Sequence, residues 1–116
     1  MDAKTLLETL RKLQEPKGYF FNADLEGLTL PLLESLIVNK DRYGYMACPC
    51  RLAVGDFETD KDIVCPCAYR EPDVAEYGAC FCGLYVSKDW NEKKIPHKTV
   101  PERRPPERLL DALTKK

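Results

Sequence analysis

The sequence predicts a mainly α, small and irregular domain, and three observations lead to this prediction. The chain has 116 residues, which is enough for one hydrophobic core and too short for two. Leucines recur at helical spacing in two segments within the first 41 residues. Nine prolines and short apolar runs then favour loops and single turns over long regular elements. We therefore expect residues 1–116 to form a single domain with two main helices and an irregular centre.

The composition is typical of a globular protein. Apolar residues make up 44% of the chain and charged residues 32%. No apolar run approaches the roughly 18 residues needed to span a bilayer, and the N-terminal residues lack the apolar segment of a secretory signal. The formal net charge of −1 argues against a protein that binds nucleic acid with its whole surface. We expect a cytoplasmic protein that binds neither membranes nor nucleic acid.

The first helix is predicted over residues Ala3 to Gln14, ending before Pro16 and Gly18. Four leucines at helical spacing form its expected buried face: Leu6, Leu7, Leu10 and Leu13. A loop from Gly18 to Gly27 follows. We expect its three aromatic side chains to turn inward: Tyr19, Phe20 and Phe21.

The second helix is predicted to start at Thr29, a residue type favoured as an N-cap. Pro31 then lies in the first turn, where a missing N–H group costs little. Four residues supply the expected buried face: Leu32, Leu33, Leu36 and Ile37. We expect the helix to end near Lys40 and Asp41.

The remainder of the chain is predicted to contain short elements only. The acidic segment Asp56–Val64 reads as a solvated connector or a short helix. Residues Pro72–Tyr77 read as a helical turn closed by Gly78, and Gly83–Val86 as an extended piece. Residues Glu107–Leu113 read as a last short helix.

Six cysteines within 35 residues are the most informative feature. They form three Cys-x-Cys pairs: Cys48-Pro49-Cys50, Cys65-Pro66-Cys67 and Cys80-Phe81-Cys82. In a small secreted protein six cysteines indicate three disulfides, but no secretory signal is visible here. A Cys-x-Cys pair also rarely closes on itself, because the ring is small and strained. We therefore favour metal or redox chemistry over a purely structural disulfide set.

Three such pairs suit an iron–sulfur centre. A 4Fe-4S cluster needs four thiolates around it, and thiolate is the soft ligand that such clusters select. A proline between two cysteines stiffens the backbone and helps to splay the two thiols. Four ligands leave two cysteines over, and two thiols beside a one-electron centre make a redox-active dithiol.

The ordered pattern of pairs resembles the catalytic (beta) subunit of ferredoxin:thioredoxin reductase. The resemblance also includes Arg51 directly after the first pair and the preceding Leu-rich helix, and it covers roughly Leu28 to Val86. It implies short helices and loops wrapped around a 4Fe-4S cluster. It also implies a disulfide reductase that takes single electrons from a ferredoxin-like donor and reduces thioredoxin or a thioredoxin-like protein. A small non-catalytic subunit, as in the chloroplast system, is a further candidate partner.

The resemblance also implies the functions of the individual cysteines. Four match the cluster ligands of the family: Cys48, Cys65, Cys67 and Cys80. The other two match the active-site disulfide of the family, with Cys50 as the exposed attacking thiol and Cys82 as the thiol that stays against the cluster.

The sequence departs from the plant and cyanobacterial pattern at the third pair. The familiar form has a histidine between the two cysteines, where this chain has Phe81. The pairs are also spaced differently, with 14 and 12 residues between them. We therefore interpret the chain as a divergent, prokaryotic-type member. His97 is the single histidine and the candidate replacement for proton transfer, although a surface residue in a Pro-rich tail is the simpler interpretation.

The C-terminal segment, residues 87–116, is Pro-rich and basic. It carries nine basic and five acidic residues, so its net charge is positive while that of the whole chain is slightly negative. Positive charge can steer the docking of an acidic ferredoxin. A solubilising, partly disordered tail is the alternative interpretation.

Two other functions compete with the reductase. A plain 4Fe-4S electron carrier would leave two cysteines without a function, and ferredoxins typically use Cys-x-x-Cys spacing. A zinc-binding interaction module would use four of the six thiols. Visible colour separates zinc from iron–sulfur, and thiol counting separates the reductase from the plain carrier.

Overall fold

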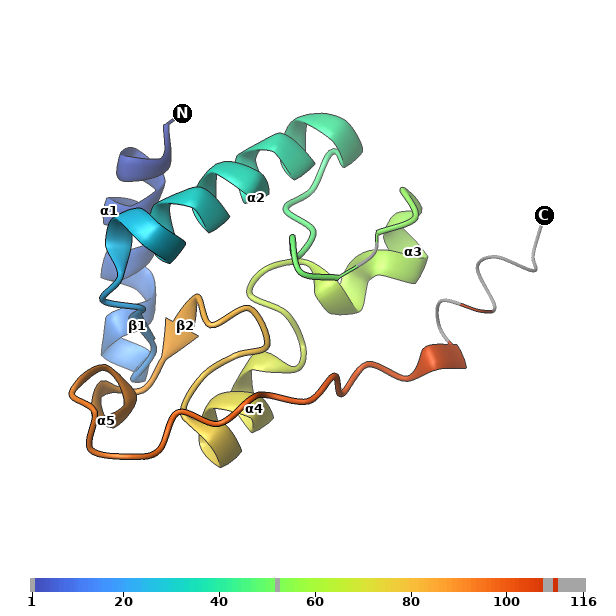
Figure 1. The fold of residues 1–116 in the computed structure, drawn as a ribbon. Coiled ribbons are helices and arrows are strands. Elements are labelled where there is room, and N and C mark those ends of the chain that lie inside the picture. The colour runs from blue at the N-terminus through green and yellow to red at the C-terminus, as the bar shows by residue number, and fades with distance from the viewer. Residues whose placement is uncertain (1, 52, 108–109, 111–116) are drawn as a thin grey trace.

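A computed structural model describes residues 2–51, 53–107 and 110 and has the mainly α architecture that the sequence predicts (Figure 1). The molecule measures 46 × 32 × 24 Å along its principal axes. Across these described ranges, no helix is long and apolar enough to cross a membrane. In chain order the elements are α1 (Ala3–Gln14), a 3-10 turn (Glu15–Lys17), β1 (Phe20–Phe21), a π-helical turn (Leu25–Thr29), α2 (Leu30–Tyr43), α3 (Phe57–Asp60), a 3-10 turn (Lys61–Ile63), α4 (Arg70–Tyr77), β2 (Tyr85–Val86) and α5 (Lys88–Asn91).

Helix α1 has the predicted bounds, but its buried face differs at one end. Leu6 and Leu7 are buried together with Ala3, whereas Leu13 is 57% exposed. At the end of the helix the buried face is occupied by Gln14, which is 6% exposed. Leu13, the residue before it, lies at the edge of the helix that faces solvent. The prediction for Leu13 is therefore wrong.

Helix α2 begins differently from the prediction. The helical backbone starts before Thr29, and the Thr29 hydroxyl donates to the carbonyl oxygen of Asn22 at 2.7 Å instead of capping the helix. The capping side chain is Asp24, which accepts a hydrogen bond from the Gly27 N–H at 3.1 Å. Pro31 lies in the first turn of α2, as predicted.

The end of α2 lies slightly beyond the predicted position. The helix runs to Tyr43 and is closed by Gly44, whose φ of 87° lies in the left-handed region that favours glycine. Of its predicted buried residues, Leu33 and Leu36 are fully buried, while Leu32 and Ile37 are half-buried.

The core lies where α1, α2 and a small sheet meet (Figure 1). Strands β1 and β2 pair antiparallel, with Phe21 opposite Tyr85. The two rings lie 4.9 Å apart between centroids, and Tyr85 is 1% exposed. This short sheet joins the start of the chain to the segment that follows the third cysteine pair.

The acidic segment before the second cysteine pair is not a solvated connector. It forms α3 and a 3-10 turn, and Asp60 is completely buried. The Asp60 carboxylate accepts hydrogen bonds from the backbone N–H groups of Val54 and Gly55 and from the Tyr45 hydroxyl. A buried carboxylate satisfied in this way anchors the loop around it.

Two further short elements agree with the sequence prediction. Helix α4 ends at Tyr77 and is closed by Gly78, whose φ is 79°, although the helix starts two residues earlier than predicted. Strand β2 lies within the predicted extended piece Gly83–Val86. The last predicted helix, Glu107–Leu113, falls mostly outside the described residues.

The C-terminal segment passes back along α4 toward α3 (Figure 1). Val100 and Arg104 are buried, at 9% and 7% exposure. Arg103 donates to the carboxylates of Asp73 at 2.6 Å and Glu76 at 2.7 Å on α4. A solvated, partly disordered tail is therefore the wrong description of the chain as far as Arg104.

We predict that Leu36→Ala lowers the free energy of unfolding by about 2–5 kcal/mol, because it leaves a cavity in the core. The control Leu13→Ala removes an exposed side chain of the same kind and should change it by less than about 0.5 kcal/mol. Anaerobic urea unfolding followed by circular dichroism measures both. Equal losses would contradict this account of the core.

Candidate functional site

The first two cysteine pairs are brought together by backbone hydrogen bonds. The Cys48 N–H donates to the Ile63 carbonyl at 2.7 Å, and the Cys65 N–H donates to the Met46 carbonyl at 2.8 Å. These two bonds form an antiparallel bridge just before each pair. Cys48 and Cys65 therefore lie one residue beyond the bridging residues Ala47 and Val64, at opposite ends of the bridge.

The third pair lies in a tight turn that leads into β2. The Cys80 N–H donates to the Tyr85 carbonyl at 2.9 Å, and the Gly83 N–H donates to the Cys80 carbonyl at 2.8 Å. Gly83 has a φ of 76°, which a side chain would strain. The Tyr85 N–H also points at the Cys80 sulfur, at 3.3 Å.

The three pairs converge on one pocket, which we call the cysteine pocket. It holds about 360 Å³ of space free of atoms, part of it open to solvent. Five of the six cysteines line it, together with two arginines and apolar side chains. The lining residues are Leu32, Cys48, Pro49, Arg51, Cys65, Cys67, Arg70, Cys80, Phe81, Cys82, Leu84 and Tyr85. The sixth cysteine, Cys50, is exposed.

Three of the thiols contact one another at the edge of this pocket. The sulfurs of Cys48 and Cys82 lie 2.9 Å apart, and the thiol of Cys50 contacts both residues. Hydrogen bonds donated by Cys48 and Cys82 hold the pKa of Cys50 well below its ordinary value. The hydrogen bonds that Cys82 makes with Cys48 and Cys50, together with burial, raise the pKa of Cys82. Cys50 is the exposed thiol of this group and therefore the one that a second protein can reach.

The remaining thiols are buried or half-buried. Burial raises the pKa values of Cys65, Cys67 and Cys80, because a thiolate is poorly stabilised away from water. Thiols of this kind become ligands when a metal centre supplies positive charge at the sulfur.

The donor set fits a 4Fe-4S cluster. Among the residues with described placement, no three His, Cys, Asp or Glu side chains converge as a site for a single metal ion. A cluster binds each thiolate at a separate iron, so its ligands need not meet at one point. Four sulfur donors around one largely apolar pocket have the chemistry that such a group requires.

Two arginines add positive charge to the pocket. Arg51 donates from Nη1 to the Cys67 sulfur at 3.4 Å. Arg70 donates from Nη1 to the Gln14 side chain at 2.8 Å, and its Cζ lies 3.8 Å from the ring centroid of Tyr19. Sequence reasoning noted Arg51 only as part of a motif and missed Arg70. The one signal in the sequence was that Arg51 directly follows the first cysteine pair and Arg70 lies three residues after the second.

Comparison with known proteins agrees with this geometry. Residues 2–104 match the family described as ferredoxin thioredoxin reductase catalytic beta chain. The chain belongs to this family. It is 33% identical over 93 residues to the ferredoxin-thioredoxin reductase catalytic chain of Porphyra purpurea, covering 72% of this chain and 71% of that protein.

Membership of the ferredoxin thioredoxin reductase family identifies the chain as an enzyme, a ferredoxin-dependent disulfide reductase. The family match extends beyond the cysteine-bearing centre at both ends. It includes α1 and the C-terminal segment as far as Arg104. Both flanking parts are therefore included in the family match.

The structure places His97 away from the lining of the cysteine pocket in this reductase. Its ring stacks on Trp90, with centroids 3.7 Å apart and planes at 4°, and its Nε2 lies 2.8 Å from the Trp90 carbonyl oxygen. The side chain is exposed. The proposed proton-transfer function of His97 therefore stays a prediction, and the geometry does not bring it to the cysteines.

Proposed function

We propose that the chain takes single electrons from a ferredoxin-like donor and uses them to reduce the disulfide of thioredoxin or a thioredoxin-like protein. The supporting observation is the division of the six thiols into five that line one pocket and one, Cys50, that is exposed beside it. A plain electron carrier has no use for an exposed thiol next to its centre.

Four cysteines would hold a 4Fe-4S cluster in this proposal: Cys48, Cys65, Cys67 and Cys80. When bound, the cluster supplies single electrons beside the Cys50–Cys82 dithiol. Cys82 lines the pocket of the proposed ligands and lies against Cys48, which supports its assignment to the cluster side of the dithiol.

The two remaining thiols carry out the exchange with the partner. The Cys50 thiolate attacks one sulfur of the partner disulfide, which forms a mixed disulfide and releases the other partner sulfur as a thiolate. The Cys82 thiolate then attacks the Cys50 sulfur, which forms the Cys50–Cys82 disulfide and releases the partner as a dithiol. Two electrons from the donor restore the dithiol.

The proposed surroundings follow from the same chemistry. Six thiols without structural disulfides suit a reducing compartment such as the cytoplasm. The exposed lysines of the C-terminal segment would favour an acidic donor, because opposite charges speed docking. A small non-catalytic subunit is also a proposed partner.

One prediction from this proposal tests the cluster ligands. Cys65→Ser should abolish or cripple the brown iron–sulfur colour and lower the stability of the protein, because ligand binding is linked to folding. Iron and sulfide analysis with visible spectroscopy measures the cluster. The control Cys50→Ser should keep the full colour. Complete retention of iron and sulfide in Cys65→Ser would contradict the assignment, and a colourless protein with bound zinc would favour the zinc module.

Another prediction tests the exposed thiol, Cys50. When the reduced enzyme meets a thioredoxin that lacks its resolving cysteine and carries its remaining cysteine as a mixed disulfide with thionitrobenzoate, the Cys50 thiolate should displace thionitrobenzoate and become disulfide-bonded to thioredoxin, because Cys50 is the exposed thiol. Peptide mapping locates this disulfide. Cys82→Ser should still form the adduct but fail in turnover, since nothing resolves it. An adduct at Cys82 would reverse the two assignments, and no adduct at either cysteine would favour a plain electron carrier.

A further prediction concerns proton transfer by His97. If the His97 imidazole takes part in proton transfer, His97→Ala should slow turnover and change the pH–rate profile, because imidazole exchanges protons near neutral pH. Steady-state rates across pH measure this. An unchanged profile would leave His97 as the stacking partner of Trp90 and nothing more.

A further inference from the structure

Arg51 is a buried cation that contacts the proposed cluster ligands. Its side chain is 1% exposed, and its Nη1 donates to the Cys67 sulfur at 3.4 Å. Its backbone N–H donates to the Cys48 carbonyl at 3.2 Å. Its guanidinium carbon lies 5.0 Å from the ring centroid of Tyr69 and 4.6 Å from that of Phe81. These contacts hold the positive charge inside the cysteine pocket.

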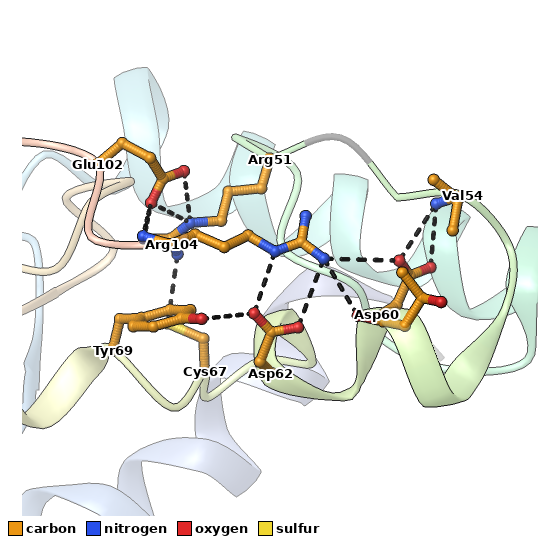
Figure 2. A network of polar contacts seen from close by, with 9 residues as sticks. Arg51, Val54, Asp60, Asp62, Cys67, Tyr69, Glu102 and Arg104 are labelled. Atoms are coloured by element: carbon orange, nitrogen blue, oxygen red, sulfur yellow. Dashed lines mark hydrogen bonds and ion pairs between the residues drawn. The ribbon is translucent and has the colours of Figure 1, made fainter. Parts of the chain in front are cut away.

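Glu102, from the C-terminal segment, holds this guanidinium from the other side (Figure 2). The Arg51 Nε donates to both carboxylate oxygens at 2.9 Å, and Nη2 lies 2.9 Å from Oε1. Burial by itself would raise the pKa of Glu102, but the hydrogen bonds from Arg51 outweigh it and lower the pKa. Glu102 is therefore ionised at neutral pH, and its side chain keeps 39% of its surface exposed.

Arg104 in turn holds Glu102 in place. Its backbone N–H donates to Glu102 Oε1 at 2.9 Å. Its side chain is 6% exposed, donates from Nε to Asp62 at 3.0 Å, and lies 4.0 Å from the buried carboxylate of Asp60. A continuous series of hydrogen bonds and ion pairs thus leads from α3 and the 3-10 turn after it, through Arg104, Glu102 and Arg51, to the sulfur of Cys67 (Figure 2).

We propose that Arg51 and Glu102 together set the reduction potential of the iron–sulfur cluster. Arg51 places positive charge at a ligand sulfur. Glu102 is a positioning residue that orients this charge and partly neutralises it. The inference rests on the proposed function, since it requires the cluster ligand Cys67.

The sign of each effect follows from electrostatics. Reduction adds negative charge beside Cys67, and a fixed cation stabilises the reduced form more than the oxidised form. Hydrogen bonds to cluster sulfurs and local charge are established determinants of cluster potential. Loss of the Arg51 charge should therefore lower the potential. Loss of the Glu102 charge, with an oxygen acceptor retained, should leave the Arg51 charge less neutralised and raise the potential.

The experiment compares three variants of the cluster-loaded protein: Arg51→Gln, Glu102→Gln and Glu76→Gln. Glu76 is the matched control, because it pairs with Arg103 of the same C-terminal segment at 2.7 Å but lies on α4. Its substitution changes the net charge as Glu102→Gln does. Anaerobic redox titration, followed by visible absorption and electron paramagnetic resonance, measures the midpoint potential.

Arg51→Gln should shift the one-electron equilibrium about tenfold toward the oxidised form, which corresponds to a potential lower by about 59 mV. Glu102→Gln should give a smaller shift of opposite sign, because its carboxylate is partly solvated. Glu76→Gln should leave the potential unchanged. Opposite signs for the first two variants are the signature, since two variants that merely loosen the pocket would shift the potential in the same direction.

Shifts of equal sign in Arg51→Gln and Glu102→Gln would overturn the inference, as would an equal shift in Glu76→Gln or no shift in any variant. If Arg51→Gln fails to hold a cluster, the midpoint potentials of Glu102→Gln and Glu76→Gln are compared. A potential raised only in Glu102→Gln supports the inference, and equal potentials overturn it. A wild-type protein that binds no iron–sulfur cluster would overturn the proposed function and this inference with it. A bound cluster with unshifted potentials would overturn this inference alone.

Discussion

The gathering of five buried or half-buried thiols in one pocket is the constraint on which the rest of the structure depends. A thiolate away from water is unstable unless positive charge or hydrogen-bond donors face it. The structure supplies both, through two buried or half-buried arginines and through backbone donors such as the Tyr85 N–H at Cys80. The core of α1, α2 and the small sheet supports the turn that carries the third pair, so the packing of the leucines and the geometry of the sulfurs are linked.

The C-terminal segment completes the support of the pocket. Three consecutive charged residues contact three separate parts of the fold: Glu102 contacts Arg51, Arg103 contacts α4, and Arg104 contacts the turn after α3. Exposed ion pairs contribute little to stability, whereas a buried charge that loses its partner is costly. Arg104 and Arg51 are of the second kind, so this segment is an integral part of the site.

Local signals explain which predictions from the sequence are confirmed. The leucine repeat and Pro16 define α1, and Gly78 closes α4, because helical periodicity and caps act within a few residues. Two of the differences from the prediction, at Thr29 and Asp60, concern residues whose partners lie outside their own element. Thr29 bonds to Asn22 instead of capping α2, and the buried Asp60 binds a neighbouring loop and Tyr45.

The sequence by itself determined the set of sulfur donors, their grouping in pairs and the two main helices, because residue type and short spacings carry that information. Only the tertiary structure decided that His97 stacks on Trp90 and that Glu102 faces Arg51. Glu102 and Arg51 are 51 residues apart in the chain. Such pairings leave no periodic pattern in the sequence, since they depend on the path of the backbone through space and on which charges must be matched once water is excluded.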